Sequence, residues 1–372
     1  MADLAVTSLS LAQFRSHAQA NLSVDARSVA IFGANGAGKT NILEAVSLLS
    51  PGRGLRRAAA EDMARRSAGV GWRIRATIEL AGQTNEIETG QQPNSSRAVR
   101  INDKVATQSA LGRIGRVIWL IPAMDRLWIE GADGRRRFLD RATLSFEPEH
   151  GEAVLGYDKA MRERNRLLKD GVQDAHWYRA LEHRMAETGA QIIANRDRTV
   201  ALLTSAQTEA RTAFPAAALQ IMQPDGGDLP SQPDDLAQAL AESRSADMRA
   251  GRSLVGPHRS DLSAAYAAKS VAARDCSTGE QKALLISLIL ANGRALKENF
   301  GAPPILLLDE VAAHLDPDRR AALYEEIVAL GAQAWMTATE PALFAELGTR
   351  AQYLAVREQD GTSQAKAMEH LP

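Results

Sequence analysis

Residues 31–46 read IFGANGAGKTNILEAV, and this stretch decides the fold. Gly33 to Thr40 match the pattern GxxxxGK[ST] at each fixed position. Glycines let such a loop turn tightly, so that its backbone N–H groups point inward at phosphate oxygens. Lys39 would reach the β and γ phosphates, and the Thr40 hydroxyl would bind Mg²⁺. The residues predicted to bind a nucleoside triphosphate are Gly33, Ala34, Asn35, Gly36, Ala37, Gly38, Lys39, Thr40 and Asn41.

A chance match to this pattern arises on the order of once per hundred chains of this length. Here the apolar run SVAIF precedes the loop, and apolar residues recur at helical spacing after Lys39. This strand–loop–helix context favours phosphate binding, because the positive end of the helix adds to the attraction for an anion.

The composition of the chain fits a large globular protein. Of its 372 residues 45% are hydrophobic, and the formal net charge is −1, so binding to polyanions would depend on local patches. The single cysteine, Cys276, excludes an internal disulfide framework and fits a reducing cytosol. No stretch has the pattern of a signal peptide or the length of a membrane span. We therefore expect a cytoplasmic protein.

Alternation and apolar runs predict the strands around the loop. Residues 4–14 and 71–80 alternate in the manner of half-buried strands. Residues 116–121 and 303–310 are short apolar runs, and such runs are typical of buried parallel strands. The pattern toward both ends of the chain is therefore that of an α/β protein.

A helical region interrupts this pattern. Residues 157–214 contain no proline and carry apolar residues at helical spacing on either side of the turn signal KDGVQD. They predict two long antiparallel helices that project as an arm; a compact helical bundle is the alternative. We predict an α/β head formed by residues 1–125 and 250–372, with an inserted helical arm domain at 126–249.

The run ILLLDE at 305–310 places two carboxylates at the end of a predicted buried strand. Asp309 is predicted to hold Mg²⁺, and Glu310 to take a proton from an attacking water as general base. Apolar strands often end in acidic turns, so the run is weak on its own. Its position far downstream of a phosphate loop favours the catalytic interpretation, with Lys39 and Glu310 as the catalytic residues.

Residues 276–282, CSTGEQK, open another predicted helix. Serine and glycine at a helix start form an anion site, although an ordinary N-cap has the same composition. The segment resembles the signature segment of ABC-type ATPases, read as Ser-x-Gly-Glu. Cys276 stands here in place of the usual leucine, and Thr278 in place of the middle glycine.

The resemblance to ABC-type ATPases implies a site shared between two subunits. In that family the signature segment contacts the γ phosphate held by the other subunit, a role that would fall to Ser277 and Gly279. Asp316 lies where such ATPases keep a subunit-spanning aspartate. The histidine that many of them carry after the last strand is absent, which leaves Thr337 and Thr339 as candidate γ-phosphate sensors. An ATP-binding subunit of an ABC transporter is the alternative function.

Four further motifs narrow the resemblance. FRSH at 14–17, RRRFLD at 135–140, GPHRSDL at 256–262 and LLLDEVAAHLDPDRRAAL at 306–323 follow one another over nearly the whole chain. With the phosphate loop, they resemble the RecF family of bacterial DNA replication and repair proteins. The resemblance implies an ABC-type ATPase head, ATP and Mg²⁺ as cofactors, and Arg15 as a further nucleotide-binding residue.

The same resemblance implies a function. An ATP-dependent homodimer would clamp DNA at single-strand gaps and at their junctions with duplex. Weak, DNA-stimulated ATP hydrolysis would act as a switch rather than as a motor. RecR and RecO would be partners in helping RecA load, and the protein would be associated with the nucleoid.

A local excess of arginine marks a candidate DNA surface. Residues 51–75 hold seven arginines against two acidic residues, Glu61 and Asp62. Arginine suits phosphate oxygens whatever the base sequence, whereas a solvated surface or pairing with acids is the alternative. The residues predicted to contact DNA are Arg53, Arg56, Arg57, Arg65 and Arg66.

A second arginine cluster at 135–141 is explained at least as well by structural pairing. Aromatic residues make up 5% of the chain and do not interleave with basic ones. Duplex or junction backbone is therefore favoured as the DNA target over single-strand base stacking.

Overall fold

The computed structural model describes residues 4–65, 69–224 and 226–371, and the chain divides into two compact units. The first unit comprises Met1–Asp125, Glu209–Pro215 and Thr278–Pro372. The second comprises Arg126–Thr208 and Ala216–Ser277. Within the described ranges, none of the helices combines the length and apolar character that a bilayer crossing requires.

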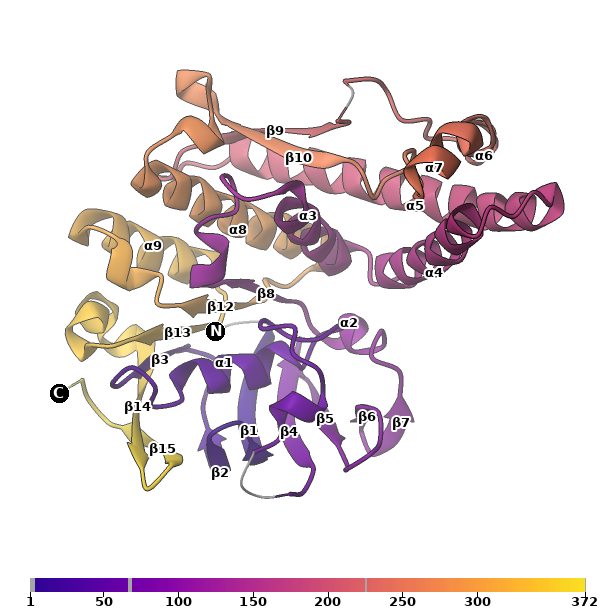
Figure 1. Cartoon of the computed structure of the whole chain (residues 1–372). Helices are drawn as coiled ribbons and strands as arrows, with labels where there is room; N and C mark the ends of the chain where they lie inside the picture. Colours follow the sequence, from indigo (N-terminus) through magenta and orange to yellow (C-terminus); the bar gives the residue numbers. More distant parts are fainter. Residues whose placement is uncertain (1–3, 66–68, 225, 372) are drawn as a thin grey trace. The chain divides into compact units, whose positions relative to one another are not determined.

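A six-stranded sheet carries the phosphate loop in the first unit. Its strands are β3 (Ser28–Phe32), β8 (Val117–Leu120), β12 (Ile305–Asp309), β13 (Ala334–Ala338), β14 (Ala351–Gln359) and β15 (Thr362–Met368). Their order is β15-β14-β3-β13-β12-β8, and all neighbours are parallel except β14 and β15 (Figure 1). The central strands β3, β13 and β12 are buried along their whole length, as apolar runs in a covered parallel sheet are.

Helices cover both faces of this sheet. Helix α1 (Lys39–Ser47) packs against β12 and β13 on one face, while α8 (Thr278–Phe300) and α9 (Pro317–Leu330) lie on the other (Figure 1). Alternate residues of β12 serve the two faces. Leu307 joins the core that contains Ile42 of α1, whereas Leu306 and Leu308 face α8 and α9.

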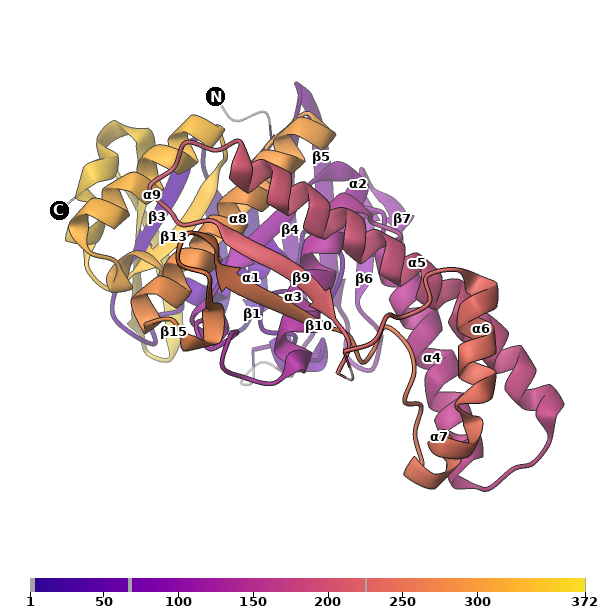
Figure 2. The same ribbon diagram turned by 90° about the horizontal axis from the view of Figure 1, so that it is seen from above.

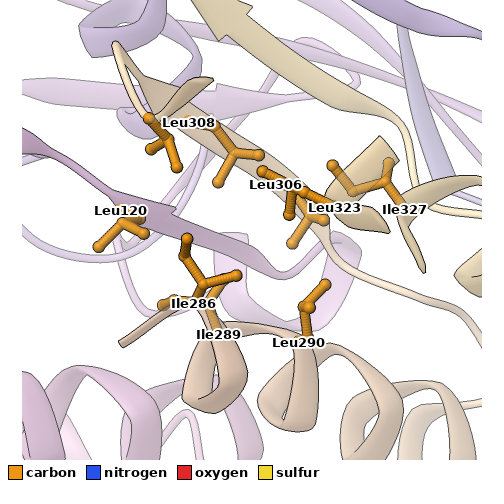
Figure 3. Close-up of a pocket in the computed structure, with 9 residues that line it drawn as sticks. Leu120, Ile286, Ile289, Leu290, Leu306, Leu308, Leu323 and Ile327 are labelled. Carbon is orange, nitrogen blue, oxygen red and sulfur yellow. The ribbon is translucent and has the colours of Figure 1, made fainter. Parts of the chain in front are cut away.

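Figure 3 shows the face of the sheet that is covered by α8 and α9. The pocket drawn there is enclosed by β8, β12, α8 and α9, and no polar atom lines it. It is therefore a gap in the hydrophobic core rather than a ligand site. Its lining residues are Leu120, Ile286, Ile289, Leu290, Leu306, Leu308, Val311, Leu323 and Ile327.

A second, antiparallel sheet completes the first unit, with the short helix α2 (Leu111–Ile114) after it. Its strands are β1 (Leu4–Phe14), β2 (His17–Ser23), β4 (Trp72–Leu80), β5 (Gln83–Gln91), β6 (Ala98–Ile101) and β7 (Lys104–Ala106), in the order β2-β1-β4-β5-β6-β7. Strand β4 buries alternate residues, as its sequence predicts.

One buried amide joins the two sheets. Gln333, just before β13, accepts a hydrogen bond from the Val6 N–H at 2.9 Å and donates to the Val6 carbonyl at 2.9 Å. It also donates to the Asp25 carbonyl at 2.8 Å and accepts from the Trp335 indole N–H at 3.0 Å. All four of its hydrogen-bonding positions are used, so this amide fixes β1 against the parallel sheet.

The second unit is mainly helical. It contains α3 (Ala132–Phe146), α4 (His150–Lys169), α5 (Ala175–Thr208), α6 (Pro233–Glu242), α7 (Arg244–Ala250) and a small sheet of β9 (Ala217–Met222), β10 (Asp261–Tyr266) and β11 (Val271–Ala272). The predicted antiparallel pair is present as α4 and α5, which lie side by side (Figure 2). Helix α6 packs on α5, and α7 on α4, so the pair is not bare.

The compact units divide at a different place from the predicted boundary at residue 250. Residues 250–277 lie in the second unit, and 209–215 lie in the first. The reason is pairing between strands: β10 pairs antiparallel with β9 along its whole length, and this holds the GPHRSDL segment in the second unit. Such pairing leaves no local signal in the sequence.

The motifs RRRFLD and GPHRSDL meet inside the second unit. Arg135 donates to both carboxylate oxygens of Asp261, at 2.7 and 2.8 Å, and Arg136 donates to the carbonyl of Ser260 at 2.9 Å. These contacts fix α3 to the start of β10. They support structural pairing, the alternative considered for this arginine cluster.

Candidate nucleotide-binding site

The phosphate loop connects β3 to α1, and two of its glycines occupy positions that other residues fit poorly. Gly33 has φ +150° and Gly38 has φ +104°. A Cβ atom on Gly33 would lie 2.1 Å from the Val356 carbonyl oxygen, and one on Gly38 would lie 2.3 Å from Ser363 Oγ. Glycine at both positions lets the loop run directly into the first turn of α1.

Lys39, the first residue of α1, folds back over the loop. Its side chain is 4% exposed, and Nζ donates to the carbonyls of Gly33 at 2.7 Å and Ala34 at 3.0 Å. Burial lowers the pKa of Lys39, while the charges of Glu310 and Asp309 act in the opposite direction. The hydrogen bonds of the ammonium go to neutral carbonyls, and the nearest carboxylate oxygen, Glu310 Oε1, is 4.0 Å away, so phosphate oxygens at the loop would be stronger partners.

Asp309, the last residue of β12, receives two hydroxyl groups. Thr40 Oγ1 donates to Asp309 Oδ1 at 2.9 Å, and Thr337 Oγ1 donates to the same oxygen at 2.7 Å. The parallel register pairs Asp309 with Thr337 directly. A hydroxyl and a carboxylate this close are oxygen ligands of the kind that Mg²⁺ takes from proteins, its other ligands being phosphate and water. Thr40 and Asp309 therefore fit a Mg²⁺ site.

Glu310 occupies an unusual backbone conformation directly after β12. Its φ is +53°, a region that non-glycine residues rarely adopt and that costs on the order of 1–3 kcal/mol. Its N–H donates to Thr337 Oγ1 at 3.0 Å, which holds this conformation. The carboxylate is about one-third exposed, with Oε1 4.0 Å from Lys39 Nζ. Backbone strain of this kind is typical of functional sites.

The two candidate sensor residues differ in position. The Thr337 hydroxyl is buried and engaged with Asp309 and with the Glu310 N–H. Thr339 lies one residue beyond β13 and is half-buried. The geometry of Thr337 therefore suits the orientation of the acidic pair more than direct contact with phosphate.

The buried carboxylate of Glu44 on α1 binds one arginine predicted to contact nucleotide and one predicted to contact DNA. Glu44 is fully buried and accepts two hydrogen bonds from Arg15, at 2.8 and 2.6 Å. Arg56 donates to Glu44 at 2.9 Å and to Asn41 Oδ1 at 2.6 Å. Arg15 and Asn41 were predicted to bind nucleotide and Arg56 to bind DNA. In this structure Arg15 and Arg56 bind Glu44, and Asn41 binds Arg56.

The remaining arginines of the predicted DNA surface lie in different environments. Arg65 donates to the Gly361 carbonyl at 3.1 Å and to Thr362 Oγ1 at 2.7 Å. Arg53 and Arg57 are exposed. Arg66 lies outside the described residues. Exposure and internal contact are therefore not alternatives in this segment, since Arg56 is exposed and also binds Glu44.

The residues predicted to complete the site of a second protomer are exposed. Ser277 and Gly279 flank the first residue of α8. Asp316 is the N-cap of α9, where its side chain accepts the Arg319 N–H at 2.9 Å and is 52% exposed. Near the start of α8, Lys282 forms an ion pair with Asp125, with Nζ 3.2 Å from Oδ2.

Sequence reasoning missed a group of residues around Gly38. His17 Nε2 lies 3.2 Å from the Gly38 carbonyl oxygen. Ser16 Oγ accepts hydrogen bonds from Asn41 Nδ2 and from Ser363 Oγ, each at 2.6 Å. The FRSH motif contains Ser16 and His17 but suggests no role for them. Ser363 has no local signal, because only the folded chain brings it to the loop.

Known proteins match the chain along nearly its whole length. The family described as the RecF/RecN/SMC N terminal domain matches residues 5–364. The DNA replication and repair protein RecF of Rhizobium rhizogenes (strain K84) is 47% identical over 361 residues, which are 94% of this chain and 96% of that protein. The chain belongs to the RecF family. RecF of Rhizobium meliloti (strain 1021) is 46% identical, with the same coverage.

Solved structures show the same fold. A structure of the recombination mediator protein RecF-ATP in the RecFOR pathway superimposes with a TM-score of 0.81 at 22% identity, over 99% of this chain and 100% of that one. An SmcHead bound to the C-winged helix domain of ScpA gives 0.58 at 16% identity, over 98% and 97%. The predicted fold class, an α/β ABC-type ATPase head interrupted by inserted helices, is confirmed.

Proposed function

We propose that this chain is an ATP-dependent DNA-binding protein of replication and recombinational repair. The observation that carries the proposal is the convergence of Lys39, Thr40, Asp309 and Glu310 on one loop, from two separate segments of chain. The names of its relatives support it, since they are DNA replication and repair proteins, and one solved relative is a RecF-ATP structure. The same names favour repair over an ABC transporter subunit.

ATP hydrolysis follows from the roles of these four side chains. Lys39 exchanges the carbonyls of Gly33 and Ala34 for the β and γ phosphates, and Thr40 and Asp309 hold Mg²⁺. The metal, when bound, neutralises charge on the phosphate oxygens. Glu310 would accept a proton from water while the water oxygen bonds to the γ phosphorus and the bond from that phosphorus to the β–γ bridging oxygen breaks, which releases ADP and phosphate.

The proposed site is completed by a second copy of the chain. Ser277 and Gly279 of one protomer would contact the γ phosphate held by the other, and Asp316 would span the two. Their exposure supports this role, because a residue that serves another subunit must be accessible before the dimer forms. ATP would then join two protomers around DNA, and hydrolysis would remove the γ-phosphate contacts and open the dimer. Turnover in such a switch is weak and is stimulated by DNA.

DNA contact is proposed for the arginine-rich segment that follows α1. Arg53 and Arg57 are exposed, and a guanidinium group at the surface suits phosphate oxygens. Arg56 and Arg65 would have to leave their internal partners before they could bind DNA, and Arg66 would extend the same segment. The targets proposed are single-strand gaps and their junctions with duplex. RecR and RecO would be partners in the loading of RecA at the nucleoid, in the cytoplasm.

The test is the substitution Glu310→Gln, which removes the proton acceptor and keeps the side-chain volume. The variant should bind ATP, hydrolyse it at least about a hundredfold more slowly, and accumulate as a dimer. Molecular mass in solution is measured with and without ATP and gapped DNA. Lys39→Ala is the control, expected to bind no ATP and to stay monomeric. A Glu310→Gln variant that stays monomeric at saturating ATP would rule out the shared site.

A further inference from the structure

We infer that His17 is a positioning residue of the phosphate loop. Its imidazole fixes the peptide between Gly38 and Lys39, so that the Lys39 N–H is turned toward bound phosphate. The inference rests on the proposed ATP site and adds to it the first residue of β2.

The hydrogen bond from His17 has a defined direction. His17 is fully buried, and its Nε2 lies 3.2 Å from the Gly38 carbonyl oxygen. A carbonyl oxygen only accepts hydrogen bonds, so the proton of the ring must be on Nε2. Burial lowers the pKa of His17, and a neutral ring near pH 7 carries this single N–H. The same carbonyl accepts the Asn41 N–H at 3.1 Å.

Peptide geometry makes this contact relevant to phosphate. The peptide is planar and trans, so the Gly38 carbonyl and the Lys39 N–H point in opposite directions. With the carbonyl held by His17 on one side, the N–H is directed to the other side. Gly38 also sits at φ +104°, and a glycine is the residue least able to hold one conformation by itself. An external anchor therefore has most effect at this peptide.

His17 begins β2 directly after a turn that is itself bonded to two other elements. Its neighbour Ser16 accepts a hydrogen bond from Asn41 of α1 and one from Ser363 of β15, each at 2.6 Å. The Ser363 N–H also donates to the Ser16 carbonyl at 2.9 Å. The backbone that carries the imidazole is thus held in place by its neighbours. A positioning group must itself be held in this way to orient another residue.

The experiment compares two substitutions of similar length, of which only one can donate a hydrogen bond. His17→Gln keeps a donor within reach of the Gly38 carbonyl, and His17→Met does not. Isothermal titration of the full chain with MgATP should give a dissociation constant about tenfold higher for His17→Met than for the natural protein, and His17→Gln should stay within about threefold. In steady-state hydrolysis the loss should appear in KM, with kcat nearly unchanged.

His150→Met is the control for general destabilisation. His150 is also buried and is bonded to Asp140 at 3.0 Å in the second unit. This variant should lower the Tm without changing the dissociation constant for ATP. Should His17→Met not fold, His17→Phe takes its place, because phenylalanine supplies a flat, slightly larger aromatic ring that has no N–H to donate.

The outcomes separate the two proposals. A natural protein that binds no MgATP overturns the proposed function and this inference with it. A natural protein that binds MgATP, with His17→Gln and His17→Met equal in affinity, leaves the proposed function standing and overturns the role of His17.

Discussion

The substitution Thr337→Val tests how the acidic pair is held. Valine has nearly the shape of threonine, so it fills the same space in β13 without the hydroxyl. The change removes two contacts: the 2.7 Å hydrogen bond to Asp309 Oδ1 and the acceptor of the Glu310 N–H at 3.0 Å. Thr40 would remain as the other hydroxyl on Asp309.

The magnitude follows from these two contacts. A hydrogen bond to a charged group contributes about 1.5–3 kcal/mol, and a buried N–H left without a partner costs about 1–3 kcal/mol. We expect the free energy of unfolding to fall by about 2–4 kcal/mol, because part of each loss is recovered by relaxation. If the loss at Asp309 is fully felt when ATP reacts, it converts to about a tenfold to hundredfold slower turnover.

The assay pairs urea unfolding with ATP turnover in the presence of DNA. Thr337→Ser keeps the hydroxyl and should lie near the natural protein in both measurements. The reasoning is refuted if Thr337→Val turns over ATP at the natural rate, or if Thr337→Ser is as impaired as Thr337→Val.

Two further predictions concern the stability of each unit. Gln333→Leu should lower the free energy of unfolding by about 3 kcal/mol or more, since it leaves the Val6 N–H and C=O buried without partners. Gln352→Leu, which removes a half-exposed amide that also contacts Asp25, should cost less than about 1 kcal/mol in the same urea titration, and equal losses would contradict the account. In the second unit, burial lowers the pKa of His258 to about 4, whereas an unfolded histidine titrates near 6.5. The unfolded state therefore binds the proton first, and stability should fall as the pH drops from about 6.5 toward 4, by at most about 1.4 kcal/mol per pH unit. His258→Gln should show a shallower fall over that range, and an unchanged slope would contradict the assignment.

The sequence predicted the parts of the site that are local. The strand, loop and helix from Ser28 to Ser47 lie within twenty residues, and their residue pattern reflects one phosphate-binding turn. The run that ends in Asp309 and Glu310 could be recognised because it lies downstream of a phosphate loop in an α/β pattern. In that context, acidic residues at the end of a buried strand suit Mg²⁺ and a general base. The long helices α4 and α5 were visible from periodicity, which depends only on neighbouring turns.

The parts that escaped prediction depend on contacts between distant segments. Ser16 and Ser363 are 347 positions apart in the chain. Composition likewise cannot distinguish an arginine that faces solvent from one that faces a carboxylate. Arg56 and Arg135 both come from arginine-rich segments, yet Arg56 binds Glu44 and Arg135 binds Asp261.

The place of β3 in its sheet has a consequence for biosynthesis. Both neighbours of β3 come from the far end of the chain, with Ser28 paired to Ala351 and Val29 to Trp335. A ribosome adding about 5–20 residues per second needs roughly 15–65 s to proceed from Ser28 of β3 to Ala351 of β14. Throughout that interval β3 cannot pair with both β13 and β14, and the phosphate loop that follows β3 is not held in place. The nascent chain should therefore bind ATP only when translation is nearly complete.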